Sequence, residues 1–118
     1  MQANRRTAER MESVGLMTNL FDGRSAVLGL VEDVSRGGLR VSAIPRAFED
    51  GVETCYAVVN GGWRDFHLAL RPRWVEPAPR GRGVYKRVGF QILHPPTAWM
   101  NFIKEKEDEQ HSDMVFAA

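Results

Sequence analysis

The sequence predicts a small all-β domain followed by one C-terminal helix. Between residues 14 and 93, short apolar runs alternate with polar residues at every second position and are separated by Gly, Pro and Asp. After Pro95 and Pro96 the apolar spacing changes from two residues to three or four, which is the period of a helix. About six antiparallel strands at this spacing favour a small barrel or sandwich.

The strands are predicted from alternation and from the turn residues between them. Side chains expected to face the interior recur at every second position in three runs: Leu39, Val41 and Ala43; Phe66, Leu68 and Leu70; Val88, Phe90 and Ile92. Turns are expected at residues 22–23, 49–51, 60–62 and 77–83, which contain Asp-Gly, Asn-Gly or Pro. Pro72 interrupts one run, so we expect an edge strand or a bulge there, because proline has no N–H to donate.

The C-terminal helix is expected to begin with Thr97 as its cap and to place Trp99, Phe102 and Ile103 on one face. This face either closes the barrel or offers a surface to a partner. The acidic run that follows is expected to form a solvated, fraying tail. The predicted organisation is a flexible arm over residues 1–12, a barrel over 13–94, and a helix with acidic tail over 95–118.

Composition limits the classes of function. The chain of 118 residues fits one domain, and its formal net charge of +1 is too small for holding a long nucleic acid by charge alone. The single cysteine, Cys55, excludes an internal disulfide and favours the cytoplasm. No apolar stretch has the length of a signal peptide or a membrane span. Of the 16 basic residues, 13 are arginine and 3 are lysine, an imbalance that favours ligands recognised by shape.

Catalytic and metal-binding patterns are weak in this sequence. His67, His94 and His111 are far apart, and Cys55 lies in an apolar run. No glycine-rich phosphate loop or metal-ligand spacing is present. We therefore expect a binding protein with no catalytic residues, no metal and no cofactor.

The first candidate binding motif is the N-terminal run that contains Arg5, Arg6 and Arg10. Taken alone, such a run is usually a solvated basic start to a chain. All three basic positions are arginine, however, and a guanidinium binds phosphate through two parallel hydrogen bonds, pairs with the edge of guanine and stacks on a base. The motif therefore indicates a ligand that carries phosphate and guanine.

The second candidate motif is the segment from Asp33 to Leu39, which reads Asp-Val-Ser-Arg-Gly-Gly-Leu. Asp and Ser side chains commonly bond to backbone amides in turns, and two glycines permit the positive φ that a tight corner can need. The simplest interpretation is a corner between strands. The functional interpretation is that Asp33 accepts hydrogen bonds from the N1 and N2 donors of guanine, with Arg36 near a phosphate.

Together the two motifs resemble the signature of the PilZ family of cyclic di-GMP receptors. Arg6-x-x-x-Arg10 and Asp33-x-Ser35-x-x-Gly38 are separated by 22 residues. The resemblance implies an all-β fold, a six-stranded antiparallel PilZ-type β-barrel with a flanking helix. It also implies a site in which the arginines contact phosphates and guanine, Asp33 and Ser35 read a guanine edge, and Gly38 holds the turn open.

The resemblance further implies how the protein works in bacterial second-messenger signalling. Arg5, just before the motif, predicts that two intercalated cyclic di-GMP molecules bind each protomer. We expect the arm to become ordered on binding and to pass the signal to a partner protein or to a second copy, with the face of Trp99, Met100 and Phe102 as the first surface to consider. Two alternatives remain open: a degenerate PilZ interaction module that binds no nucleotide, and a small-barrel nucleic-acid binder.

Overall fold

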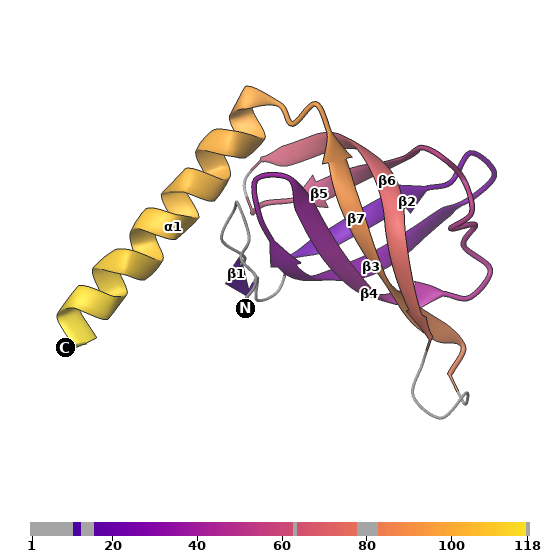
Figure 1. Cartoon of the computed structure of the whole chain (residues 1–118), viewed down its shortest axis with the longest axis horizontal. Coiled ribbons are helices and arrows are strands. Elements are labelled where there is room, and N and C mark those ends of the chain that lie inside the picture. Colours follow the sequence, from indigo (N-terminus) through magenta and orange to yellow (C-terminus); the bar gives the residue numbers. More distant parts are fainter. Residues whose placement is uncertain (1–10, 13–15, 63, 78–82, 118) are drawn as a thin grey trace, which may run out of the picture.

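The computed structural model describes residues 11–12, 16–62, 64–77 and 83–117. Six strands form a closed antiparallel barrel, and a seventh, short strand lies at its edge (Figure 1). The strands are β1 (Met11–Glu12), β2 (Met17–Phe21), β3 (Ala26–Val34), β4 (Gly38–Pro45), β5 (Cys55–Asn60), β6 (Asp65–Pro77) and β7 (Tyr85–Leu93), and the helix is α1 (Thr97–Ala117). The sheet order β3-β2-β5-β6-β7-β4 closes because β3 also pairs with β4. The predicted barrel is confirmed, and the sandwich is excluded.

The barrel interior is filled by the side chains that alternate inward along the six strands, as expected for period-two sequences. The predicted inward residues of β6 and β7 are all buried. In β4, Leu39 and Val41 are buried but Ala43 is exposed, so this part of the prediction was wrong. The cause is an irregularity between Val41 and Ile44, where Ala43 adopts φ 59° and the next residue, Ile44, turns inward instead.

Pro72 lies at a bulge in a strand with two neighbours. The pairing of β6 with β7 shifts register between Pro72 and Trp74, which confirms the bulge and excludes the edge strand. Trp74 then lies against Gly89 of β7, where a Cβ atom would be 2.1 Å from the indole ring. Only glycine fits at that position without moving the tryptophan.

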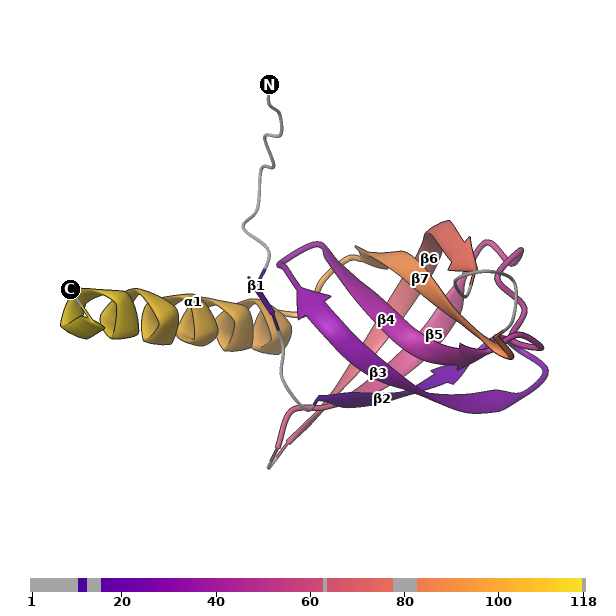
Figure 2. The ribbon, with the colours of Figure 1, turned by 90° about the horizontal axis from the view of Figure 1, so that it is seen from below.

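The helix α1 closes one end of the barrel with its first turns and then extends away from it (Figure 2). Trp99 and Ile103 are fully buried, and the ring of Trp99 meets Phe66 edge-on at a centroid distance of 5.5 Å. Thr97 is the first helical residue, and the carbonyl of Pro96 accepts the first helical hydrogen bond from Met100 N–H at 3.0 Å. The expected start is thus confirmed to within one residue.

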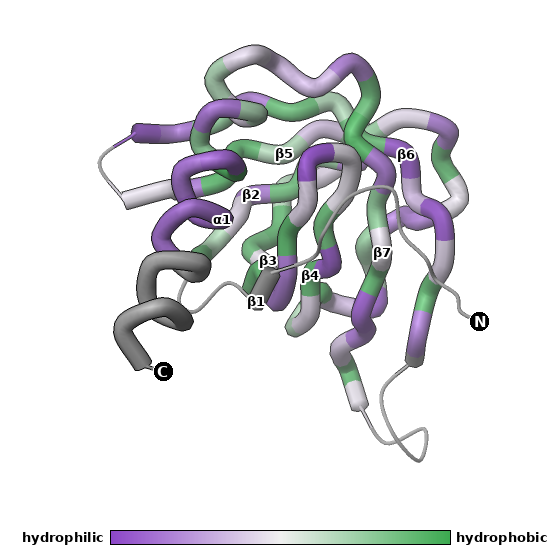
Figure 3. The backbone as a smooth tube through the Cα atoms, turned by 60° about the vertical axis from the view of Figure 1, so that its left-hand side comes forward, coloured by the Kyte–Doolittle hydropathy of each residue, from purple (hydrophilic) through white to green (hydrophobic). Residues whose placement is uncertain are grey.

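The acidic run belongs to α1 and does not form the separate tail that was expected, although Glu105, Asp108 and Glu109 are exposed to solvent as expected. The helix continues through the segment without Gly or Pro to Ala117. Glu and Lys are favourable helix residues, and Lys106 pairs with Glu109 one turn later at 3.9 Å. Figure 3 shows the coloured middle turns of the helix as hydrophilic, whereas the hydrophobic segments gather in the barrel strands. Among the described residues, no helix is both long and apolar enough to cross a lipid bilayer.

The opposite end of the barrel, which we call the stapled end, consists of the turn at 22–25 and the loop at 46–54. The carboxylate of Asp22 accepts hydrogen bonds at 2.8 Å from the backbone N–H groups of Arg24, Ser25 and Glu49. Lys86 Nζ donates to the carbonyl of Phe48 at 2.6 Å and pairs with Asp50. These bonds tie both loops to the barrel.

Candidate functional site

The second sequence motif forms the tight turn between β3 and β4. Ser35 N–H donates to the carbonyl of Gly38 at 2.9 Å, and Ser35 Oγ donates to the same carbonyl at 3.3 Å. The carbonyl of Gly37 accepts from Ile92 N–H of β7 at 2.8 Å. Of the described glycines only Gly23 and Gly62 have positive φ, so the expectation that Gly37 and Gly38 supply it was wrong. The serine closes this turn through its backbone and side chain.

Asp33 is held by an arginine that the sequence analysis did not single out. Arg40 Nε donates to Asp33 Oδ2 at 2.9 Å, and Arg40 Nη2 bonds to the same oxygen. The two residues are direct partners in the β3–β4 ladder, and the carboxylate side chain is 7% exposed. Arg40 also lies over the ring of Trp74, at 6.0 Å from its centroid. Counting register back from the predicted turn would have found the pair.

The same turn is joined to α1 by two side-chain contacts. Trp99 Nε1 donates to the carbonyl of Ser35 at 3.2 Å within the buried core. Arg36 Nη2 donates to Glu107 Oε1 at 3.1 Å nearer the surface. We call the turn at 33–38, with these contacts to Arg40 and α1, the motif end of the barrel. Sequence spacing could not reveal the Arg36–Glu107 contact because 71 residues separate its partners.

The chain directly after the first sequence motif lies at the motif end of the barrel. Arg5, Arg6 and Arg10 lie outside the described residues. The strand β1 begins at the next residue, Met11, and pairs antiparallel with the end of β3, Met11 opposite Val34 and Glu12 opposite Asp33. The backbone that follows the arginine motif is therefore paired with the end of β3, which carries the first residue of the Asp-x-Ser motif.

The histidines and the cysteine do not form a reactive cluster in the described part of the chain. His67 is exposed on β6, and His94 lies in the connection before α1 with φ 49°. Cys55 is buried, and burial, followed by the charge of Asp22, raises the pKa of its thiol to about 12. Within the described ranges, no group of three His, Cys, Asp or Glu side chains could hold a metal ion.

The first turns of α1 do not offer the partner surface considered from the sequence. Trp99 is fully buried, and Met100 and Phe102 are half-buried, so this face closes the barrel. A larger exposed apolar surface lies instead on the outside of β2, β3 and β5, where the registers place Phe21 beside Tyr56. Phe21, Leu28, Leu30 and Tyr56 are 38–56% exposed there. These residues are scattered in the sequence, so the sequence analysis did not predict this surface.

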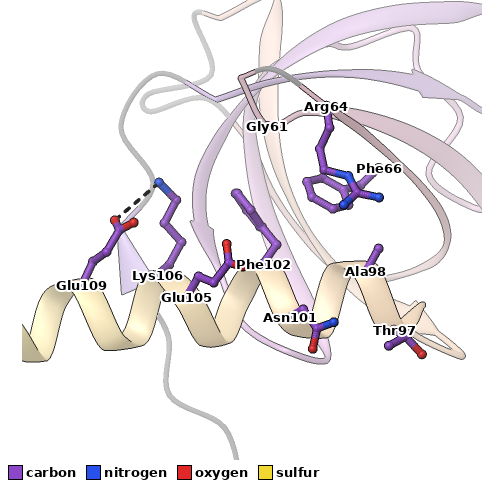
Figure 4. A pocket seen from close by; sticks show the side chains of 10 residues that line it. All are labelled: Gly61, Arg64, Phe66, Thr97, Ala98, Asn101, Phe102, Glu105, Lys106 and Glu109. Carbon is purple, nitrogen blue, oxygen red and sulfur yellow. Dashed lines mark ion pairs between the residues drawn. The ribbon is translucent and has the colours of Figure 1, made fainter.

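A cavity of about 510 Å³ lies between α1 and the turn that joins β5 to β6 (Figure 4). Its walls include Phe66 and Phe102, whose rings are 4.7 Å apart at their centroids. Arg64 lies over the first ring and Lys106 over the second. The charges of Glu105 and Glu109 in the same wall offset these cations. The cavity therefore has no net preference for an anion.

Comparison with known proteins finds similar structures but no similar sequences. No protein-family model matches the sequence, and no curated protein sequence matches it. The structure is similar to the inhibitor of motility MotI (DgrA) of Bacillus subtilis, with 15% identity and a TM-score of 0.73, over 94% of this chain and 53% of that one. It is also similar to MrkH in the K. pneumonia MrkH–c-di-GMP complex, with 12% identity and a TM-score of 0.73, over 98% of this chain and 57% of that one.

A third similar structure matches over almost its whole length. It is the PilZ domain of YcgR from Escherichia coli with c-di-GMP, with 18% identity and a TM-score of 0.64, over 93% of this chain and 98% of that one. The chain thus spans just over half the length of MotI and MrkH but nearly all of this domain. From this similarity and the closed six-stranded barrel, the chain has the PilZ-domain fold.

Proposed function

We propose that this protein is a receptor for cyclic di-GMP that binds the ligand at the motif end. The observation that carries the proposal is the pairing of β1 with β3, Glu12 opposite Asp33. Because consecutive Cα atoms are about 3.8 Å apart, the covalent chain keeps Arg10 near Met11 and thus near the Asp33 end of β3. Two motifs separated in the sequence would therefore contribute to one site.

The chemistry of the two motifs complements the ligand. Cyclic di-GMP carries two phosphates and two guanines, and arginine binds both groups well. Arg6 and Arg10 would contact the phosphates and a guanine face or edge, and Arg36 would contact a phosphate. Asp33 and Ser35 would read the guanine edge, and Gly38 would hold the turn open beside them. Similar solved structures named as c-di-GMP complexes support the choice of ligand.

The number of ligands is a separate part of the proposal. Arg5 precedes the motif, and its guanidinium would stack on a base of a second, intercalated cyclic di-GMP. The proposed stoichiometry is two ligands per protomer. Titration calorimetry should give two for the wild type and one for Arg5→Ala, and one ligand for both proteins would contradict it.

The proposed output is a conformational signal with no chemistry performed on the ligand. The motif end is joined to α1 through Ser35 and Arg36, so binding there would be transmitted to the helix. A separate cytoplasmic partner or a second copy of the chain would receive the signal. The apolar surface of Phe21, Leu28, Leu30 and Tyr56 favours such an interaction, since large exposed apolar patches often mark binding surfaces.

A thermal-shift comparison tests the class of ligand. The melting temperature of the protein should rise with cyclic di-GMP and stay unchanged with GTP or a single-stranded oligonucleotide. A rise with the oligonucleotide alone would support a nucleic-acid binder, and no rise with any of the three would support an interaction module that binds no nucleotide. The variant Arg24→Ala serves as a control, because this exposed arginine lies at the stapled end.

A further inference from the structure

One ion pair reaches from the proposed binding turn to the outer part of α1. Arg36 Nη2 and Glu107 Oε1 are 3.1 Å apart. The side chain of Arg36 is 49% exposed, whereas that of Glu107 is only 13% exposed. The guanidinium is thus open to solvent and to a ligand, although it already binds a carboxylate of the same chain.

We propose that Glu107 sets the ligand affinity of the motif end by competing with the ligand for Arg36. The inference rests on the proposed function, because the competitor is a phosphate of cyclic di-GMP. Carboxylate and phosphate oxygens bind the guanidinium through the same N–H groups. A phosphate that binds Arg36 therefore displaces Glu107 or shares its donors, and either outcome weakens the contact with α1.

The two contacts between the turn and α1 divide the helix into parts that respond differently. Trp99 is fully buried, and its indole N–H bonds to the carbonyl of Ser35, so the first turns stay attached when Arg36 changes partner. Glu107 lies two turns later in α1, beyond Ile103, the last residue of the helix in the hydrophobic core. Release of Glu107 would therefore loosen the outer turns of α1 and leave its start in place.

Thermodynamic linkage fixes the sign of the effect. If the ligand weakens the contact between Arg36 and Glu107, then loss of that contact must strengthen ligand binding by the same factor. Partly exposed ion pairs contribute little, so the expected gain on removing Glu107 is about two- to fivefold in affinity. A residue that supported the site would show the opposite sign.

A simpler effect must be separated from this competition. Any acidic side chain near an anionic ligand lowers its affinity through charge alone, without any contact to Arg36. Asp108 is exposed on the adjacent position of α1 and supplies a matched control for charge. The double variant Arg36→Ala with Glu107→Gln removes the shared guanidinium, so a pure charge effect would persist there and the competition would not.

Calorimetric titration with cyclic di-GMP provides the test. We expect Glu107→Gln to bind about two- to fivefold more tightly than the wild type and Asp108→Asn to bind equally well. In the Arg36→Ala background, Glu107→Gln should leave the affinity for cyclic di-GMP unchanged. Equal or weaker binding by Glu107→Gln, or an equal gain in the Arg36→Ala background, would overturn the inference while leaving the proposed function intact. A wild-type protein without binding would overturn both.

Amide hydrogen exchange supplies a readout that needs no ligand. In the free protein, Arg36→Ala and Glu107→Gln should each speed exchange in the outer turns of α1, and the double variant should exchange no faster than either single variant. Exchange around Trp99 should stay unchanged. Outer-turn exchange at the wild-type rate in both single variants would show that the ion pair does not hold the helix, and would also overturn the inference.

Discussion

At the stapled end of the barrel Asp22 is held by three backbone amides, whereas at the motif end Asp33 is held by the side chain of Arg40. Both carboxylates are largely buried. The amides that hold Asp22 are fixed by the loops themselves, and no ligand can replace them without unfolding those loops. The guanidinium groups of Arg40 and Arg36 are side-chain partners that an incoming anion can share.

Under the proposed function, this difference gives the two ends separate tasks. Charges bound to backbone amides contribute to stability, because their loss leaves buried donors unsatisfied. Charges bound to opposite side chains can exchange partners at lower cost, as a binding site requires. Substitutions at the stapled end should therefore change stability alone, and substitutions at the motif end should also change binding. Trp99 is the exception at the motif end, since it belongs to the core.

The largest effect on stability is expected for Trp99→Ala. This change removes a fully buried indole and its hydrogen bond to Ser35, and should lower the free energy of unfolding by about 3–5 kcal/mol in urea denaturation. Asn101→Ala, an exposed position two residues after Trp99 in α1, should change it by less than about 0.5 kcal/mol. A similar small change for Trp99→Ala would show that α1 does not close the barrel.

A smaller loss is expected for Asp22→Ala at the stapled end. Three backbone N–H groups lose their acceptor, so the free energy of unfolding should fall by about 2–3 kcal/mol. Affinity for cyclic di-GMP should stay at the wild-type value, because the motif end is untouched. Asp65→Ala, an exposed carboxylate, serves as the matched control. Weaker ligand binding by Asp22→Ala alone would break the division between the two ends.

The stapled end should also give a pH dependence. Hydrogen bonds from the backbone N–H of Glu49, then of Ser25 and Arg24, lower the pKa of Asp22 from 3.8 to about 2. A carboxyl group with a lowered native pKa stabilises the fold above its unfolded pKa, and this contribution is lost as the pH falls towards the native pKa. The stability difference between wild type and Asp22→Asn should therefore be constant above about pH 5 and shrink steadily from about pH 4 to pH 2. A difference that is as large at pH 2 as at neutral pH would contradict this explanation.

Much of the fold could be predicted because local patterns determine it. Alternation along β6 and β7 identified their buried faces. The Asp-Gly and Asn-Gly steps identified two turns, which contain the backbone hydrogen bonds from Asp22 to Ser25 and from Gly61 to Arg64. Pro72 predicted a bulge because proline has no backbone N–H to donate, which interrupts the strand pairing at that residue. Ala43 could not be placed this way, since its outward position depends on how β4 pairs with β7. The length of α1 was missed because a charged run suits a helix and a solvated tail equally well.

The candidate site was only partly predictable for a related reason. Asp33, Ser35, Arg36 and Gly38 form one turn because they are close in sequence. The partner Arg40 could have been found from the register of the predicted turn, but Trp99 and Glu107 are set by the direction of α1, which sequence spacing does not encode. Arg5, Arg6 and Arg10 lie outside the described residues, so their part in the site stays a prediction.

The central claim is that the arginine motif and the Asp-x-Ser turn form one binding site, and calorimetry on Arg10→Ala tests it most directly. An arginine contact with guanine contributes about 1–3 kcal/mol, so cyclic di-GMP should bind Arg10→Ala roughly ten- to a hundredfold more weakly than wild type. Arg24→Ala, which removes the same charge at the stapled end, should bind as the wild type does. Equal affinity in all three proteins would contradict the claim.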